Sequence, residues 1–187
     1  ALEHYAQALR DNPDAHIVQN NIGDLLIRQG KFEEALTHLE EALRLRSTYA
    51  EACNNLGRAL MHLDRFGDAQ PYLEKAVAYD ATSYMAYSNL GIVLDRTGQH
   101  GKATEMYQAA LRVNPRFAEG HNNLGVSFRD SGRLDLAENC FRQAVRLRPV
   151  YFEAYRNLGE TLAGLSRTEE AIRAFEAALH IAPSDAQ

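Results

Sequence analysis

Residues 118–149 read AEGHNNLGVSFRDSGRLDLAENCFRQAVRLRP, and the residue types of this stretch recur along the whole chain. Its central glycine, Gly125, belongs to a series whose members lie 34 residues apart: Gly23, Gly57, Gly91, Gly125 and Gly159. Ala137 and Ala144 recur at the same interval. A fixed period of about 20 to 50 residues is the signature of a repeat architecture. We therefore expect a stack of similar supersecondary units.

Each repeat is predicted to contain two amphipathic helices of about 13 residues, because its apolar residues follow the helical period. A glycine just past the first helix can cap it in the left-handed conformation, and Gly30, Gly98 and Gly132 stand there. Prolines end the second helix in four copies: Pro13, Pro115, Pro149 and Pro183. The mid-helix glycines cost about 1 kcal/mol each against alanine. They therefore need a packing reason, and we expect Gly57 to let its helix approach the helix that carries Leu73.

These residues resemble the tetratricopeptide repeat (TPR) family. In the copy quoted above, the family pattern is carried by His121, Leu124, Gly125, Phe128, Ala137, Phe141, Ala144 and Pro149. The resemblance implies an all-α fold, a right-handed superhelical solenoid whose first helices line the concave surface. It predicts eleven helices in a single array: a half repeat at 1–15, then full repeats at 16–49, 50–83, 84–117, 118–151 and 152–185.

Two departures from the family pattern carry expectations. Cys53 and Gln19 stand where a large residue is usual, which predicts looser packing of those first helices. Pro71 falls inside a second helix, and Asp68 is a possible N-cap that would place this proline in the first turn. We therefore expect that helix to begin late.

An asparagine stands two residues before each glycine of the series, and we call this set the Asn ladder: Asn21, Asn55, Asn89, Asn123 and Asn157. Asn20, Asn54 and Asn122 precede three of its members. An amide side chain has two donors and an acceptor, which suits the backbone of an extended peptide. The ladder, with Asn54 and Asn122, is therefore a candidate peptide-binding site. The alternative is structural, since the same amides can bridge neighbouring first helices.

The other residues expected on the inward face combine both charges with an apolar patch. Arg58 and Arg96 are candidate peptide contacts among acidic neighbours such as Asp24 and Glu51. The resemblance implies that a co-chaperone member of the family would grip a C-terminal carboxylate with lysine and arginine on its first helices. Glu51, Glu119 and Glu153 stand at such positions here, which argues against a chaperone-tail ligand. Met85, Ile92 and Val126 can form an apolar anchor site, or they are scattered surface residues.

Composition and motifs argue against several classes of function. The net charge of −5 and pI near 5.8 provide no general attraction for nucleic acid or anionic membrane, so neither is an expected partner. Histidines and cysteines show no metal spacing, and phosphate-binding and nucleophile motifs are absent. We expect no catalysis, cofactor or metal, and a cytoplasmic location.

Two functions are compatible with these features. The first is a scaffold that binds a partner protein or an extended peptide. The second is the substrate-recruiting arm of a larger enzyme, since the Asn ladder is similar to that of the TPR arm of protein O-GlcNAc transferases. Exposed apolar residues at the last helix also suggest that the chain continues as a longer array or associates end to end.

Overall fold

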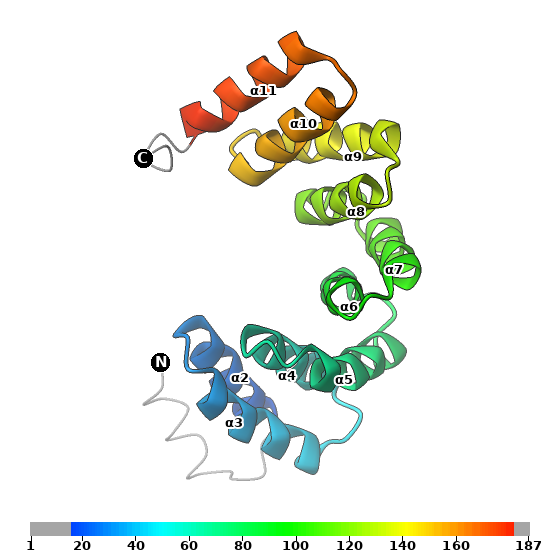
Figure 1. The fold of residues 1–187 in the computed structure, drawn as a ribbon. Coiled ribbons are helices and arrows are strands. Elements are labelled where there is room, and N and C mark those ends of the chain that lie inside the picture. The colour runs from blue at the N-terminus through cyan, green and yellow to red at the C-terminus, as the bar shows by residue number, and fades with distance from the viewer. Residues whose placement is uncertain (1–15, 182–187) are drawn as a thin grey trace. The chain divides into compact units, whose positions relative to one another are not determined.

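A computed structural model of the chain describes residues 16–181, and within this range all secondary structure is helical (Figure 1). The first helices of the repeats are α2 (His16–Arg28), α4 (Ala50–His62), α6 (Tyr84–Arg96), α8 (Ala118–Asp130) and α10 (Phe152–Gly164). The second helices are α3 (Phe32–Leu45), α5 (Phe66–Tyr79), α7 (His100–Val113), α9 (Leu134–Leu147) and α11 (Thr168–Ile181). First helices have 13 residues and second helices 14. The predicted half repeat at 1–15 lies outside the described residues.

The described helices divide into two compact units, one with α2 to α6 and one with α7 to α11, and the boundary lies between residues 99 and 100. In the first unit α2 packs on α3 and α4 on α5, while α4 also contacts α2 and α6. In the second unit α8 packs on α9 and α10 on α11, and α8 contacts α10. First helices therefore lie side by side within each unit, which places their polar residues on a shared face.

The glycines of four first helices, Gly23, Gly57, Gly125 and Gly159, lie directly against a large side chain of the second helix. A Cβ atom added to Gly57 would lie 2.5 Å from Cγ of Leu73, and one added to Gly125 would lie 2.7 Å from the ring of Phe141. Leu73 and Phe141 are fully buried. The predicted close approach is confirmed, and it explains why this position carries no larger residue.

The turn inside each repeat depends on one residue in the left-handed conformation. Gly30, Gly98 and Gly132 have φ angles of 75°, 78° and 75°. In the other two repeats Asp64 and Ser166 adopt the same conformation, with φ angles of 55° and 59°. The next residue then donates its backbone N–H back into the first helix, as Arg167 does to the carbonyl of Leu162 at 2.9 Å. The expected glycine caps are confirmed, and the two L-residues that replace glycine adopt this conformation at a steric cost.

The expectations for Pro71 and for Cys53 were wrong, whereas the looser packing expected at Gln19 stays a prediction. Helix α5 begins at Phe66 without delay and includes Pro71, while Asp68 accepts a hydrogen bond from Arg65 at 2.8 Å instead of capping the helix. The contacts of α5 with α4 and α6 outweigh the single backbone bond that proline removes. Cys53 is fully buried and packs with Ala76 and Ala86, so its small side chain fits closely packed neighbours.

We expect Gly57→Ala to lower the free energy of unfolding by about 1–2 kcal/mol, because displacing the buried Leu73 outweighs the gain in helix propensity. Gly67→Ala is the matched control. Gly67 is also helical, but a Cβ atom there meets nothing within 4 Å, so stability should rise by about 0.5–1 kcal/mol. Thermal and urea unfolding would compare the two variants, and equal stabilisation would contradict the packing argument.

Ser166→Gly should raise the free energy of unfolding by about 1 kcal/mol, because glycine adopts a positive φ without the steric cost that serine carries. The reverse change at the equivalent turn, Gly132→Ala, should lower it by a similar amount. Urea unfolding of both variants tests this pair. A neutral effect of both changes would show that the left-handed turns carry no strain.

Candidate functional site

The shared face of the first helices carries a different residue in each repeat at the position after the glycine: Asp24, Arg58, Ile92, Val126 and Glu160. The Asn ladder lies one turn earlier on the same helices. The side chains around the ladder asparagines therefore differ from one repeat to the next, although the backbone structure of the repeats is the same. The contacts of three ladder members show what this variation does.

Asparagines of neighbouring first helices bond to each other. The amide N–H of Asn55 donates to the amide oxygen of Asn20 at 3.0 Å, and Asn89 donates to Asn54 at 2.9 Å. In the second unit Asn157 donates to Asn122 at 2.9 Å. Each bond joins residues 35 positions apart, which is one repeat plus one residue. The doublets at 20–21, 54–55 and 122–123 therefore supply an acceptor for the next first helix.

The amide oxygen of Asn55 accepts a hydrogen bond from an arginine. Arg58, one turn along α4, donates to this oxygen at 3.0 Å and to a carboxylate oxygen of Asp24 on α2 at 3.1 Å. Asp24 also pairs with Arg28 at 2.6 Å. Asn55 is only 4% exposed. This group of side chains ties α2 to α4.

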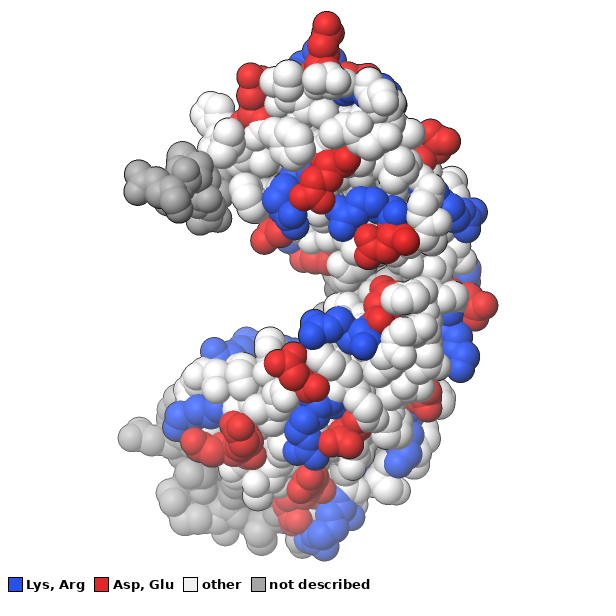
Figure 2. All heavy atoms as spheres, viewed as in Figure 1, with Lys and Arg blue, Asp and Glu red and all other residues white. Residues whose placement is uncertain are grey.

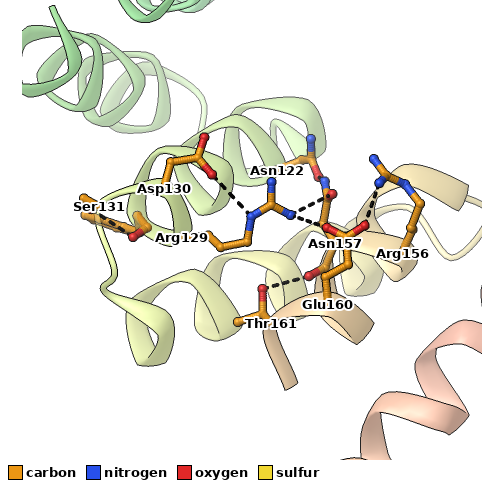
Figure 3. Close-up of polar contacts among 9 residues, drawn as sticks. Asn122, Arg129, Asp130, Ser131, Arg156, Asn157, Glu160 and Thr161 are labelled. Carbon is orange, nitrogen blue, oxygen red and sulfur yellow. Dashed lines mark hydrogen bonds and ion pairs between the residues drawn. The ribbon is translucent and has the colours of Figure 1, made fainter. Parts of the chain in front are cut away.

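In the second unit a ladder asparagine also accepts a hydrogen bond from an arginine, but here the two residues come from different helices (Figure 3). Arg129 of α8 donates to the amide oxygen of Asn157 on α10 at 3.2 Å and to Glu160 at 2.6 Å. Glu160 also accepts from Arg156 at 2.6 Å. Asn157 is 4% exposed and is again held between an asparagine and an arginine. We call these two groups the arginine locks: Asn20, Asp24, Asn55 and Arg58 in the first unit, and Asn122, Arg129, Asn157 and Glu160 in the second.

Asn89 has no such lock. Its amide donates to Asn54, and among the described residues its amide oxygen has no hydrogen-bond donor. The position after the glycine is Ile92 on this helix, where α4 has Arg58 and α10 has Glu160. Asn89 is half-buried, and Met85, one turn before it on the same stripe of α6, is 53% exposed. This part of α6 therefore presents unused hydrogen-bonding groups beside apolar side chains.

The sequence is matched by models of the tetratricopeptide repeat family. One covers residues 14–80 and 48–116, which is more than half of the chain, and another covers 122–186. The chain belongs to the tetratricopeptide repeat family. None of the curated proteins matches its sequence.

Solved TPR structures resemble this TPR chain over nearly its whole length. MamA is 27% identical with a TM-score of 0.77, covering 88% of this chain and 96% of its own. YrrB, described as a TPR protein with an unusual peptide-binding site, is 27% identical with a TM-score of 0.77, covering 98% of this chain and 95% of its own. TTC0263 of Thermus thermophilus is 27% identical with a TM-score of 0.75, covering 91% and 93%. These findings confirm the all-α TPR solenoid fold, and the chain is a protein-interaction scaffold.

The remaining candidate residues of this TPR scaffold have various surroundings. Arg96 lies 3.6 Å from Asp64, with its guanidinium 4.3 Å from the centre of the Phe66 ring. Asn21 is half-buried on α2, while Asn123 and Val126 are half-buried on α8 of the second unit. The structure thus brings Met85, Asn89 and Ile92 together on α6, whereas Arg58 and Arg96 contact acidic side chains of the scaffold itself.

The charges of the TPR helices are interspersed. Figure 2 shows basic residues beside acidic ones on the visible face, without a large area of either sign. Within residues 16–181, no group of three or more His, Cys, Asp or Glu side chains could hold a metal ion, and no helix is long and apolar enough to cross a membrane. Burial raises the pKa of Cys140 to about 11 and raises that of Cys53, which disfavours the reactive thiolate of both cysteines.

Asn157→Ala should lower the free energy of unfolding by about 2 kcal/mol, because Asn122 and Arg129 each lose a partner in a water-poor site. Asn89→Ala removes one bond at a half-buried position and should lower it by less than about 1 kcal/mol. Thermal unfolding of the two variants measures the difference. Equal losses would show that the lock around Asn157 adds nothing to the amide pair.

Proposed function

We propose that this scaffold binds an extended, largely uncharged peptide across α4 and α6 of the first unit, with Asn89 as its hydrogen-bonding contact and Met85 and Ile92 as its apolar anchor site. The observation that carries this proposal is the amide of Asn89, which retains an acceptor and a donor beside a 53% exposed methionine. Those groups match the N–H and C=O of a peptide backbone.

The arginine locks support this choice among the ladder members. Asn55 and Asn157 each donate once, accept from an arginine and are nearly inaccessible to solvent. A peptide could reach them only by opening a lock and leaving its charges unpaired, which is costly in a buried site. We therefore assign Asn54, Asn55, Asn122, Asn157 and Arg58 to holding neighbouring first helices together.

The character of the peptide follows from the surrounding side chains. Arg28, Arg58 and Arg96 already face Asp24 or Asp64, so the face offers no excess positive charge for an acidic ligand. Methionine is flexible and polarisable, and it adapts to apolar side chains of several shapes. A peptide with one or two apolar side chains and few charges fits this site best.

The similarity to YrrB, which is described as having an unusual peptide-binding site, supports a peptide ligand. Asn21 and Arg96 are further candidate contacts in the first unit, and Asn123 and Val126 are candidate contacts on α8 of the second unit, taken by itself. The second hypothesis, the substrate-recruiting arm of a protein O-GlcNAc transferase, is not favoured, since none of the similar structures named above is such an enzyme. Members of the TPR family are generally scaffolds, and the absence of catalysis and a cytoplasmic location stay predictions for this chain.

A peptide selected from a random display library against the 187-residue chain serves as the probe. Asn89→Ala should weaken its binding about fivefold or more, because one or two hydrogen bonds of about 0.5–1.5 kcal/mol each are lost. Met85→Ala and Ile92→Ala should weaken it by a similar factor through lost apolar contact. Calorimetric titration measures the dissociation constants.

Two variants control for indirect effects. Leu136→Ala removes an exposed apolar side chain on α9, a second helix, and should leave the affinity unchanged. Asn157→Ala should lower stability but, below its melting temperature, preserve binding. If selected peptides bind the Asn89 and Met85 variants as tightly as the original chain, the proposed site is wrong.

A further inference from the structure

Helix α11 exposes an apolar stripe that is covered in the preceding repeats. Phe175 is 36% exposed, whereas the equivalent Phe141, Leu73 and Leu39 are fully buried. Ile172 and Leu179, on either side of Phe175 along the stripe, are 51% and 48% exposed. In each earlier repeat, the equivalent side of the second helix is covered by the first helix of the following repeat, as α10 covers α9. No described element packs on this side of α11.

The position of Ile172 distinguishes this edge from most repeat junctions. In three of the four earlier copies the same position is polar and bonds to a residue farther along the chain. Gln70 accepts from Gln99 at 3.0 Å, Thr104 lies 2.8 Å from the hydroxyl of Ser127, and Glu138 accepts from Arg167 at 2.6 Å. Isoleucine can form no such bond. The last helix therefore favours a purely apolar contact along its stripe.

A row of charged residues flanks this stripe at helical spacing: Glu169, Arg173, Glu176 and His180. All four are exposed, and none has a hydrogen bond or ion pair with another described residue. Acidic and basic side chains alternate along this row. Elsewhere in this unit exposed arginines do find partners, as Arg142 does with Glu138 and Glu170.

We propose that α11 is a self-association surface, on which two copies of this chain pair through antiparallel α11 helices. In that arrangement the stripes of Ile172, Phe175 and Leu179 interleave, and Arg173 of each copy lies opposite Glu176 of the other. The same register sets Glu169 of each copy opposite His180 of the other. A two-fold contact requires such self-complementarity, because the same surface patch is used twice.

The alternating row of acidic and basic residues indicates that the partner on this surface is a second copy of the chain. A row that reads acid, base, acid, base becomes base, acid, base, acid when reversed, so it complements itself only in an antiparallel pair. The contact is a single helix pair, which is below the usual size of a stable interface, so the dimer is weak and forms at high concentration. This surface is separate from the peptide site proposed on α6.

Sedimentation equilibrium of the 187-residue chain, up to about 100 µM or more, tests the proposal. We expect a monomer–dimer equilibrium. Arg173→Glu should weaken dimerisation at least tenfold, because it sets two carboxylates opposite each other at two places. Glu176→Arg should do the same with two guanidinium groups. The double variant R173E/E176R restores both ion pairs and should regain dimerisation.

Mixing the two single variants gives the most direct result, since each is self-repelling but complementary to the other. The mixture should form heterodimers under conditions in which each variant alone is monomeric. Ile172→Ser should also weaken the dimer, whereas Ile17→Ser, which changes a 53% exposed side chain on α2 of the first unit, should not. Circular dichroism establishes that each variant is folded.

A chain that stays monomeric throughout this range would overturn the proposal. So would dimers that are insensitive to Arg173→Glu and Glu176→Arg, or single variants that fail to associate on mixing. Open-ended association beyond the dimer would point to a head-to-tail contact and would equally overturn the two-fold pairing.

Discussion

In four of the five described repeats, a glycine on the first helix lets the backbone of that helix lie against a large side chain of the second. Gly57 against Leu73 and Gly125 against Phe141 fix the separation of the two helices to within the size of one methyl group. Because this contact recurs at an interval of 34 residues within each unit, the helix pairs of one unit have nearly the same geometry. Equivalent residue positions then meet at the junctions inside each unit, and this is what allows asparagines 35 positions apart to bond at three of them.

On this constant framework, the residue after the glycine determines what each repeat does. An acid or an arginine there, as at Asp24, Arg58 and Glu160, completes a lock around a buried amide. Ile92 at the same position contributes no charge, so Asn89 keeps part of its hydrogen-bonding capacity. The residues that depart from the repeat pattern therefore give one part of the face different binding properties from another.

The fold could be predicted from the sequence because its determinants are local or strictly periodic. The helix pairs, the glycine contact and the left-handed turns at Gly30, Gly98 and Gly132 all follow from residue type and spacing. The interpretation of Pro71 was wrong because it considered a single helix, whereas the packing of α5 on its neighbours decides where that helix begins. The Asn ladder could also be recognised in the sequence, but the hydrogen bonds between asparagines of neighbouring helices could not. Which amide bonds to which depends on how neighbouring first helices are offset, and one sequence does not show this.

The hydrogen bonds between asparagines have a consequence for how the chain unfolds. Each bond joins one repeat to the next, so within residues 16–181 this polar coupling is between nearest neighbours and stability is approximately a sum of local terms. Contacts of this kind are close in sequence, which favours fast folding that can start in any helix pair and spread. Where an arginine strengthens the bond, as between α2 and α4 or between α8 and α10, adjacent repeats are expected to unfold together. At α6 the link to α4 is a single amide bond, so cooperativity between these helices rests mainly on apolar packing.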